Sequence, residues 1–137
     1  MATDRLFPLQ PRSTLQLKVG DIIAVPGEPT GWACLVVVEV WRRGTGARTT
    51  FIVGVVDWSG EQAPREPDVA GLPVIAQALT RTELFTEGGL AVVGNVGAVA
   101  TTFDSNHGDY QVGAKHRVWG WKAAIRHARA QIANRVQ

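Results

Sequence analysis

Residues 19–26 read VGDIIAVP and decide the fold. We interpret them as a short apolar strand that begins at a Gly-Asp turn and ends at a proline, which lacks the N–H needed in a strand ladder. A glycine-containing break follows at residues 27–31. Residues 33–41 then read ACLVVVEVW, a run too apolar to face water. This order is typical of the start of a small, strongly bent β-sheet domain.

Further strands are expected on both sides of this segment. Residues 33–41 and 48–58 are two β-branched runs, and the glycine-containing loop between them predicts a hairpin. Upstream, apolar and polar residues alternate over residues 14–19, which predicts a half-buried strand. Downstream, with glycines marking bends, we expect strands at residues 72–79, 90–93 and 96–103, and a short connection at residues 84–85.

The C-terminal segment differs in kind. Trp121, Ile125, Ala128, Ile132 and Val136 recur at steps of 4, 3, 4 and 4 residues, which is the apolar stripe of an amphipathic helix. We therefore predict the fold class α+β: a curved antiparallel β-sheet, or a partly open barrel, packed by one C-terminal amphipathic α-helix.

Length and composition fit one folded domain. The chain has 137 residues, of which 45% are hydrophobic and 19% are charged, as is typical of globular rather than disordered chains. We divide it into an extended N-terminal arm (residues 1–13), a β-rich body (14–103) and the C-terminal helix (116–136). Cys34 is the only cysteine, so an internal disulfide is excluded and the role of a small buried hydrophobe is expected.

A cytoplasmic location is expected. No apolar run reaches the roughly 20 residues that a membrane helix needs. The N-terminus carries an acid at Asp4 and has no apolar core of roughly 7–15 residues, so it lacks the pattern of a signal peptide.

Charge is distributed unevenly along the chain. The net charge is +2, but residues 1–109 have a balance of −4, and residues 110–137 contain six Lys or Arg and no acid. The basic tail is either a nucleic-acid contact or a solvated helix face whose cations suit the helix C-terminus. We favour the helix face, because six charges over 28 residues do not make a dense patch. The acidic body would suit a basic protein partner.

No catalytic constellation is recognisable. The three histidines have no partner at metal-ligand spacing, and we expect them to face solvent: His107, His116 and His127. Folding could bring the carboxylates of Asp21, Asp57 and Glu83 together, but nothing in the sequence favours this. We therefore predict a protein that is not an enzyme, with no catalytic residues, no metal and no cofactor.

Five tryptophans are a high count for 137 residues. Trp41 and Trp121 fit the core, whereas Trp32 and Trp58 stand at strand–loop junctions. Residues 59–71 read SGEQAPREPDVAG and predict a long acidic loop, and long ordered loops are disproportionately functional. Core-rim positions explain the two junction tryptophans equally well. Our candidate partner-binding surface consists of Trp32, Trp58, Glu61, Glu66 and Asp68.

Four segments form one recognisable pattern: Gly20–Pro26, the apolar run 33–41, the second run 49–58 and Trp119-Gly120-Trp121 before the helix. This pattern resembles the immunity protein 26 family of bacterial polymorphic toxin systems. The resemblance implies a small, β-rich, cytosolic immunity protein (antitoxin) that neutralises a cognate toxin by direct, non-enzymatic binding. The implied partner is a toxin protein, and neither a membrane nor a nucleic acid is expected. The resemblance transfers no catalytic or contact residues.

The start of the first strand also supports an alternative. The Gly-Asp-Ile start at residues 20–22, with a gap and an apolar strand, is similar to the opening of MazF/PemK-type ribonuclease toxins, which are small SH3-like barrels. Those toxins place Arg-Pro at the start of the second strand as part of the RNA-cleaving site. This chain has Gly31-Trp32-Ala33 there, which argues against cleavage. The alternative function is therefore that of an SH3-like-barrel RNA-binding or ribonuclease toxin-related protein.

Overall fold

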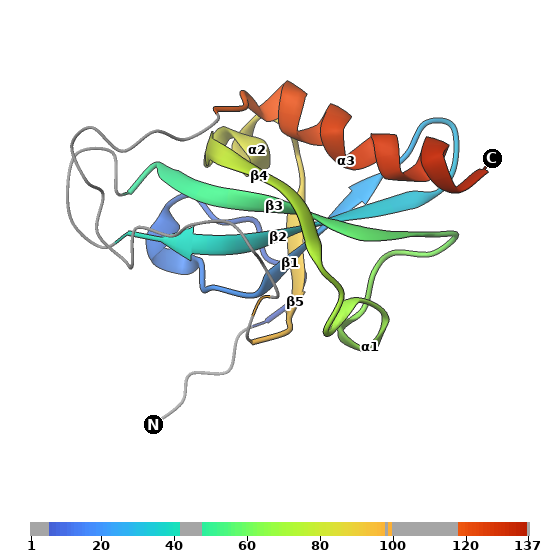
Figure 1. Ribbon diagram of the computed structural model, residues 1–137. Helices are drawn as coiled ribbons and strands as arrows, with labels where there is room; N and C mark the ends of the chain where they lie inside the picture. The colour runs from blue at the N-terminus through green and yellow to red at the C-terminus, as the bar shows by residue number, and fades with distance from the viewer. Residues whose placement is uncertain (1–5, 42–47, 98, 100–117, 137) are drawn as a thin grey trace.

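In a computed structural model, the chain forms a five-stranded antiparallel sheet packed by a C-terminal helix (Figure 1). The structure describes residues 6–41, 48–97, 99 and 118–136, with side chains up to residue 133. The predicted α+β class is confirmed. The strand order is β4-β3-β2-β1-β5. In chain order the elements are the 3-10 helix η1 (Thr14–Gln16), β1 (Asp21–Pro26), β2 (Trp32–Val40), β3 (Thr50–Gly60), α1 (Glu66–Val69), β4 (Val74–Arg81), α2 (Glu83–Thr86), β5 (Ala91–Asn95) and α3 (Trp121–Val136).

The predicted strand at residues 14–19 is wrong. Thr14–Gln16 form η1 instead, because the Ser13 hydroxyl accepts a hydrogen bond from the Leu15 N–H at 3.1 Å and stabilises a turn in place of an extended chain. Leu17 is fully buried, but Leu15 is 58% exposed. Alternate apolar residues of this segment therefore do not share one buried face.

The predicted Gly-Asp turn before β1 is confirmed, and two residues hold it. Gly20 has a φ of 90°, and a Cβ there would collide with the backbone of Gly97, so glycine is required. The buried Asp21 carboxylate accepts hydrogen bonds from the Lys18 backbone N–H at 2.9 Å and from the Asn95 side-chain amide at 2.9 Å. Asp21 thus connects the turn to the edge strand β5.

Both faces of the sheet are covered. β2 and β3 form the predicted antiparallel hairpin, whose loop residues 42–47 lie outside the described residues. Leu35 and Val37 of β2 join the main core beneath α3, whereas Cys34 and Val36 join a second cluster that includes Val69 of α1. Figure 1 shows α3 along one side of the sheet and α1 on the other. This double coverage explains why residues 33–41 lack a regular polar alternation.

The predicted apolar stripe of α3 is confirmed in its described part. Ile132 packs against the main core, and three residues of α3 are buried in that core: Ala124, Ile125 and Ala128. The helix begins at Trp121, and the Gly120 carbonyl accepts the Ala124 N–H at 3.0 Å. The helix was predicted to start at residue 116, but the described residues 118–120 are not helical. Residues 116 and 117 lie outside the described residues.

Two predicted boundaries need correction. Residues 59–71 are not one loop, because β3 continues to Gly60 and α1 occupies Glu66–Val69. The last predicted strand, 96–103, is absent from its described residues 96, 97 and 99. β5 ends at Asn95, whose Oδ1 accepts the Gly97 N–H at 2.6 Å and turns the chain. In the described part, no helix is both long and apolar enough to span a membrane.

Candidate functional site

Trp58 and Trp32 lie together on the sheet face opposite α3. Trp58 is half-buried and packs against the second cluster. Its indole covers Gly60, where an added Cβ would meet the ring at 2.6 Å. Gly60 pairs with Trp32 across the β2–β3 ladder, and Trp32 is also half-buried. The ladder therefore places both partly exposed tryptophans next to Gly60, at one end of the hairpin.

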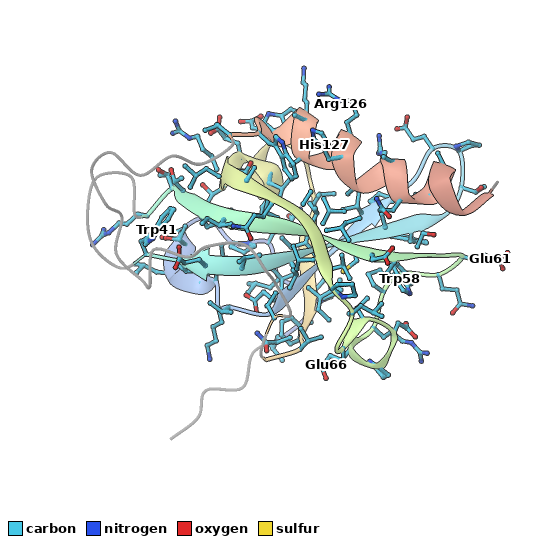
Figure 2. All side chains as sticks on the ribbon, in the orientation of Figure 1. Trp41, Trp58, Glu61, Glu66, Arg126 and His127 are labelled. Carbon is cyan, nitrogen blue, oxygen red and sulfur yellow. The ribbon has the colours of Figure 1, made fainter. Side chains whose placement is uncertain are left out.

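Glu61 extends this end of the sheet into solvent. It directly follows β3, is exposed, and has no hydrogen-bond or ion-pair partner among the described residues. Figure 2 shows Glu61 beyond Trp58 at the same end of β3. Its carboxylate is therefore available to a cationic group of a partner without first breaking an internal contact.

The other two predicted acids have structural roles. Glu66 begins α1, and its Oε1 accepts the Asn95 backbone N–H at 3.1 Å, which joins α1 to the end of β5. Asp68 accepts the Arg65 backbone N–H at 3.1 Å and pairs with the Arg65 guanidinium at 3.3 Å. The hydrogen bond from that guanidinium lowers the pKa of Asp68. The structure thus groups Trp32, Trp58 and Glu61, and it places Glu66 and Asp68 in the contacts of α1.

The three carboxylates that folding could have united do not form one group. Asp21 is buried beside Asn95 at the β1–β5 pair. The Asp57 N–H bonds to the Pro73 carbonyl toward the far end of β3. Glu83 pairs with Arg81 at 2.9 Å near the start of β3. Within the described residues, no cluster of three or more His, Cys, Asp or Glu side chains suits a metal ion.

Cys34 is buried and His127 is exposed, as the sequence predicted. Cys34 is fully buried, its thiol donates to the Leu35 carbonyl at 3.3 Å, and burial raises the pKa of the thiol. The predicted role of Cys34 as a buried hydrophobe is confirmed. His127 is exposed and stacks on Trp119 with ring centroids 4.3 Å apart. His107 and His116 lie outside the described residues.

The exposed side of α3 is basic. Lys122 and Arg126 are exposed, and the Lys122 ammonium lies 5.4 Å from the centroid of the Trp121 ring. Arg129 turns back to the sheet, where it donates to the Pro26 carbonyl at 2.8 Å and lies 3.6 Å from Glu28. These contacts agree with a solvated helix face, the interpretation that the sequence favoured.

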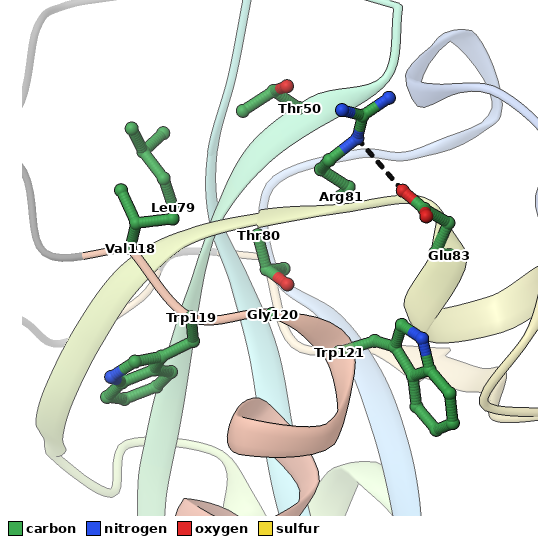
Figure 3. Close-up of a pocket in the computed structure, with 9 residues that line it drawn as sticks. All are labelled: Thr50, Leu79, Thr80, Arg81, Glu83, Val118, Trp119, Gly120 and Trp121. Carbon is green, nitrogen blue, oxygen red and sulfur yellow. Dashed lines mark ion pairs between the residues drawn. The ribbon is translucent and has the colours of Figure 1, made fainter.

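A pocket that the sequence did not suggest lies at the opposite end of β3. It has a volume of about 260 Å³ and is lined by Thr50, Leu79–Arg81, Glu83 and Val118–Trp121 (Figure 3). We call it the Thr80 pocket. Its outer wall forms because the segment before α3 joins the edge of β4, where the Trp119 N–H donates to the Leu79 carbonyl at 2.8 Å.

Comparisons with known proteins do not place the chain in a family. No protein-family model, curated protein or solved structure matches it. The resemblance to the immunity protein 26 family stays a prediction made from residues 20–26, the runs 33–41 and 49–58, and the residues before α3.

Proposed function

We propose that this protein acts by binding another protein, as an immunity protein that neutralises a bacterial toxin without catalysis. The observation that carries the proposal is that Trp32 and Trp58 both adjoin Gly60 at one end of the hairpin, beside Glu61, which has no partner among the described residues. Tryptophans are enriched among the residues that dominate protein interfaces. Binding loses less conformational entropy when an aromatic side chain is already fixed, and Trp58 is fixed by packing against the second cluster.

Charge supports a basic partner on this face. Glu61 and Glu66 are exposed acids on the side of α1, whereas Lys122 and Arg126 are exposed on α3. Because the sheet lies between α1 and α3 (Figure 1), these two acids are kept apart from Lys122 and Arg126. A negative face accelerates encounter with a positively charged protein by electrostatic steering. We therefore propose a toxin whose contact surface is rich in Lys or Arg.

Growth rescue tests the proposal. Cells that express the toxin encoded beside this gene are expected to grow when the wild-type protein is co-expressed. Glu61→Lys is expected to slow association and weaken rescue, because it reverses the free charge of the surface. The matched control is Glu87→Lys, which makes the same charge change at an exposed residue after α2. Loss of growth with soluble, folded wild-type protein present would count heavily against an immunity function.

One observation favours the RNA-binding alternative. Lys122 and Arg126 are exposed on α3 and have no acidic partner among the described residues. If this face binds RNA, a fluorescent single-stranded RNA should bind at low salt, with an affinity that falls as salt rises. The double substitution Lys122→Gln, Arg126→Gln should then reduce the salt dependence. Absence of RNA binding at low salt would end this alternative.

A further inference from the structure

We propose that the Thr80 pocket binds a free apolar α-amino acid of about the size of leucine. The inference goes beyond the proposed function and does not depend on it. The pocket and Trp58 belong to opposite ends of β3, since Thr50 lines the pocket and Gly60 lies under the Trp58 ring. At roughly 3.3 Å per residue, these ends are separated by about 30 Å along the strand.

The sheet register places four lining residues on one face of the sheet. Thr50 is paired with Arg81 across β3 and β4. Val118 is paired with Leu79 across the edge of β4. Paired residues share a face, and so do residues two apart on one strand, such as Leu79 and Arg81. Thr80 lies between these two residues and therefore on the other face, so its buried hydroxyl takes no part in the proposal.

The apolar part of the pocket accounts for the side chain of the ligand. Val118 is 71% exposed, and Figure 3 shows it beside Leu79, with the charged groups of Arg81 and Glu83 farther along β4. An apolar side chain in this position would remove Val118 from water, which favours binding. The pocket volume is about 260 Å³, and a cavity of about 150 Å³ is enough to hold benzene. The space therefore fits a four-carbon side chain together with an amino and a carboxyl group.

The ion pair of Arg81 and Glu83 accounts for the two charges of the ligand. The Arg81 Nε lies 2.9 Å from the Glu83 Oε1, and the two side chains are 66% and 46% exposed. Neither side chain makes another polar contact among the described residues. The terminal nitrogens of Arg81 and the second carboxylate oxygen of Glu83 are therefore available to a ligand. The Thr50 hydroxyl, on the same face as Arg81, likewise has no hydrogen-bond partner in the described part of the chain.

A zwitterion matches this ion pair better than an ion of one sign. A lone carboxylate on Arg81 would be repelled by Glu83, and a lone ammonium on Glu83 would be repelled by Arg81. In an α-amino acid both groups are bonded to one carbon. Its carboxylate can therefore accept from the Arg81 guanidinium and the Thr50 hydroxyl while its ammonium donates to Glu83. A peptide lacks this arrangement, because its two terminal charges are on different residues.

The test compares L-leucine with three probes that each lack one of its recognised parts. 4-Methylpentanoate lacks the ammonium, 3-methylbutylamine lacks the carboxylate, and L-alanine lacks most of the apolar side chain. Binding to the isotope-labelled full chain is followed by NMR through the backbone amides of residues 79–81 and 118–120. We expect saturable shifts of these amides, a leucine Kd on the order of 1 mM, and binding of each other probe that is weaker by about fivefold or more. The absence of saturable shifts with leucine, or an affinity within about twofold of leucine for any other probe, would overturn the proposal.

Two variants assign the charged contacts. Glu83→Gln should abolish the preference for leucine over 4-methylpentanoate, and Arg81→Gln should abolish the preference for leucine over 3-methylbutylamine. The matched controls are Glu87→Gln and Arg65→Gln, which make the same changes at exposed residues outside the pocket lining and should keep both preferences. A preference that persists in the variant meant to remove it would refute that contact and, with it, the assignment of a zwitterion.

A third variant tests the location without changing a charge. An added Cβ at Gly120 meets no atom within 4 Å, and Gly120 lines the pocket. Gly120→Leu should therefore fill part of the pocket and weaken the binding of leucine about tenfold or more. Unchanged binding would place the amino acid elsewhere and overturn the assignment.

Discussion

Thr80→Val is expected to stabilise the free protein. Thr80 lies in β4 opposite Phe51 and is 1% exposed, and its hydroxyl has no partner among the described residues. An unsatisfied buried polar group costs about 1–3 kcal/mol, and valine keeps the shape of threonine and suits a strand. We expect a gain of about 1.5 kcal/mol in the free energy of unfolding. With a urea m-value of about 2 kcal/mol/M, the midpoint should rise by about 0.7 M.

Thr50→Val separates the burial effect from strand preference. Thr50 is the first residue of β3 and is half-exposed, so the same substitution there changes strand preference without removing a buried hydroxyl. Its effect should stay within about 0.5 kcal/mol. Both variants are measured by urea unfolding with tryptophan fluorescence. If Thr80→Val is less stable than the wild type, or matches Thr50→Val, the hydroxyl has a partner in solution and the reasoning is refuted.

Three further predictions concern the fold. Gly20→Ala should lose at least about 2 kcal/mol in urea unfolding, and Gly71→Ala only about 1 kcal/mol, because both residues have positive φ but only Gly20 lacks room for a Cβ; equal losses would contradict the clash. Burial raises the pKa of Cys34, so a thiol reagent should label it at pH 8 only after denaturation, and rapid labelling of the native protein would exclude this burial. The Arg65 side chain lowers the pKa of Asp68 from its usual value of 3.8. The ionised Asp68 should therefore stabilise the fold fully above pH 3.8, and this contribution should disappear as the pH falls through the lowered pKa. The stability difference between wild type and Asp68→Asn should shrink over that range, and a difference that does not depend on pH would refute the prediction.

The sequence was informative where one local rule decides the structure. The runs at 33–41 and 48–58 are apolar enough to form strands covered on both faces, and the stripe of α3 repeats at helical spacing. At residues 14–19 two local rules conflict. Alternation favoured a strand, but the Ser13 cap favoured a turn, and backbone bonds from Gln16 to Ser13 and from Leu17 to Thr14 complete that turn.

The candidate site was only partly predictable, because its contacts join distant segments. The positions of Trp32 and Trp58 follow from the hairpin register, which the two runs suggest. The role of Glu66 depends on Asn95, 29 residues away, and no spacing rule connects them. The Thr80 pocket needs three segments around residues 50, 80 and 120 to meet at the edge of β4. Each segment alone looks like ordinary strand or helix start.

Thr80 differs from the other polar residues discussed above, because its buried hydroxyl has no hydrogen-bond partner among the described residues. Asp21, Glu66 and Asp68 each have hydrogen-bond partners that hold a turn or a helix start, as stable folds require. Thr80 opposes stability, since valine would fill the same space without an unpaired hydroxyl.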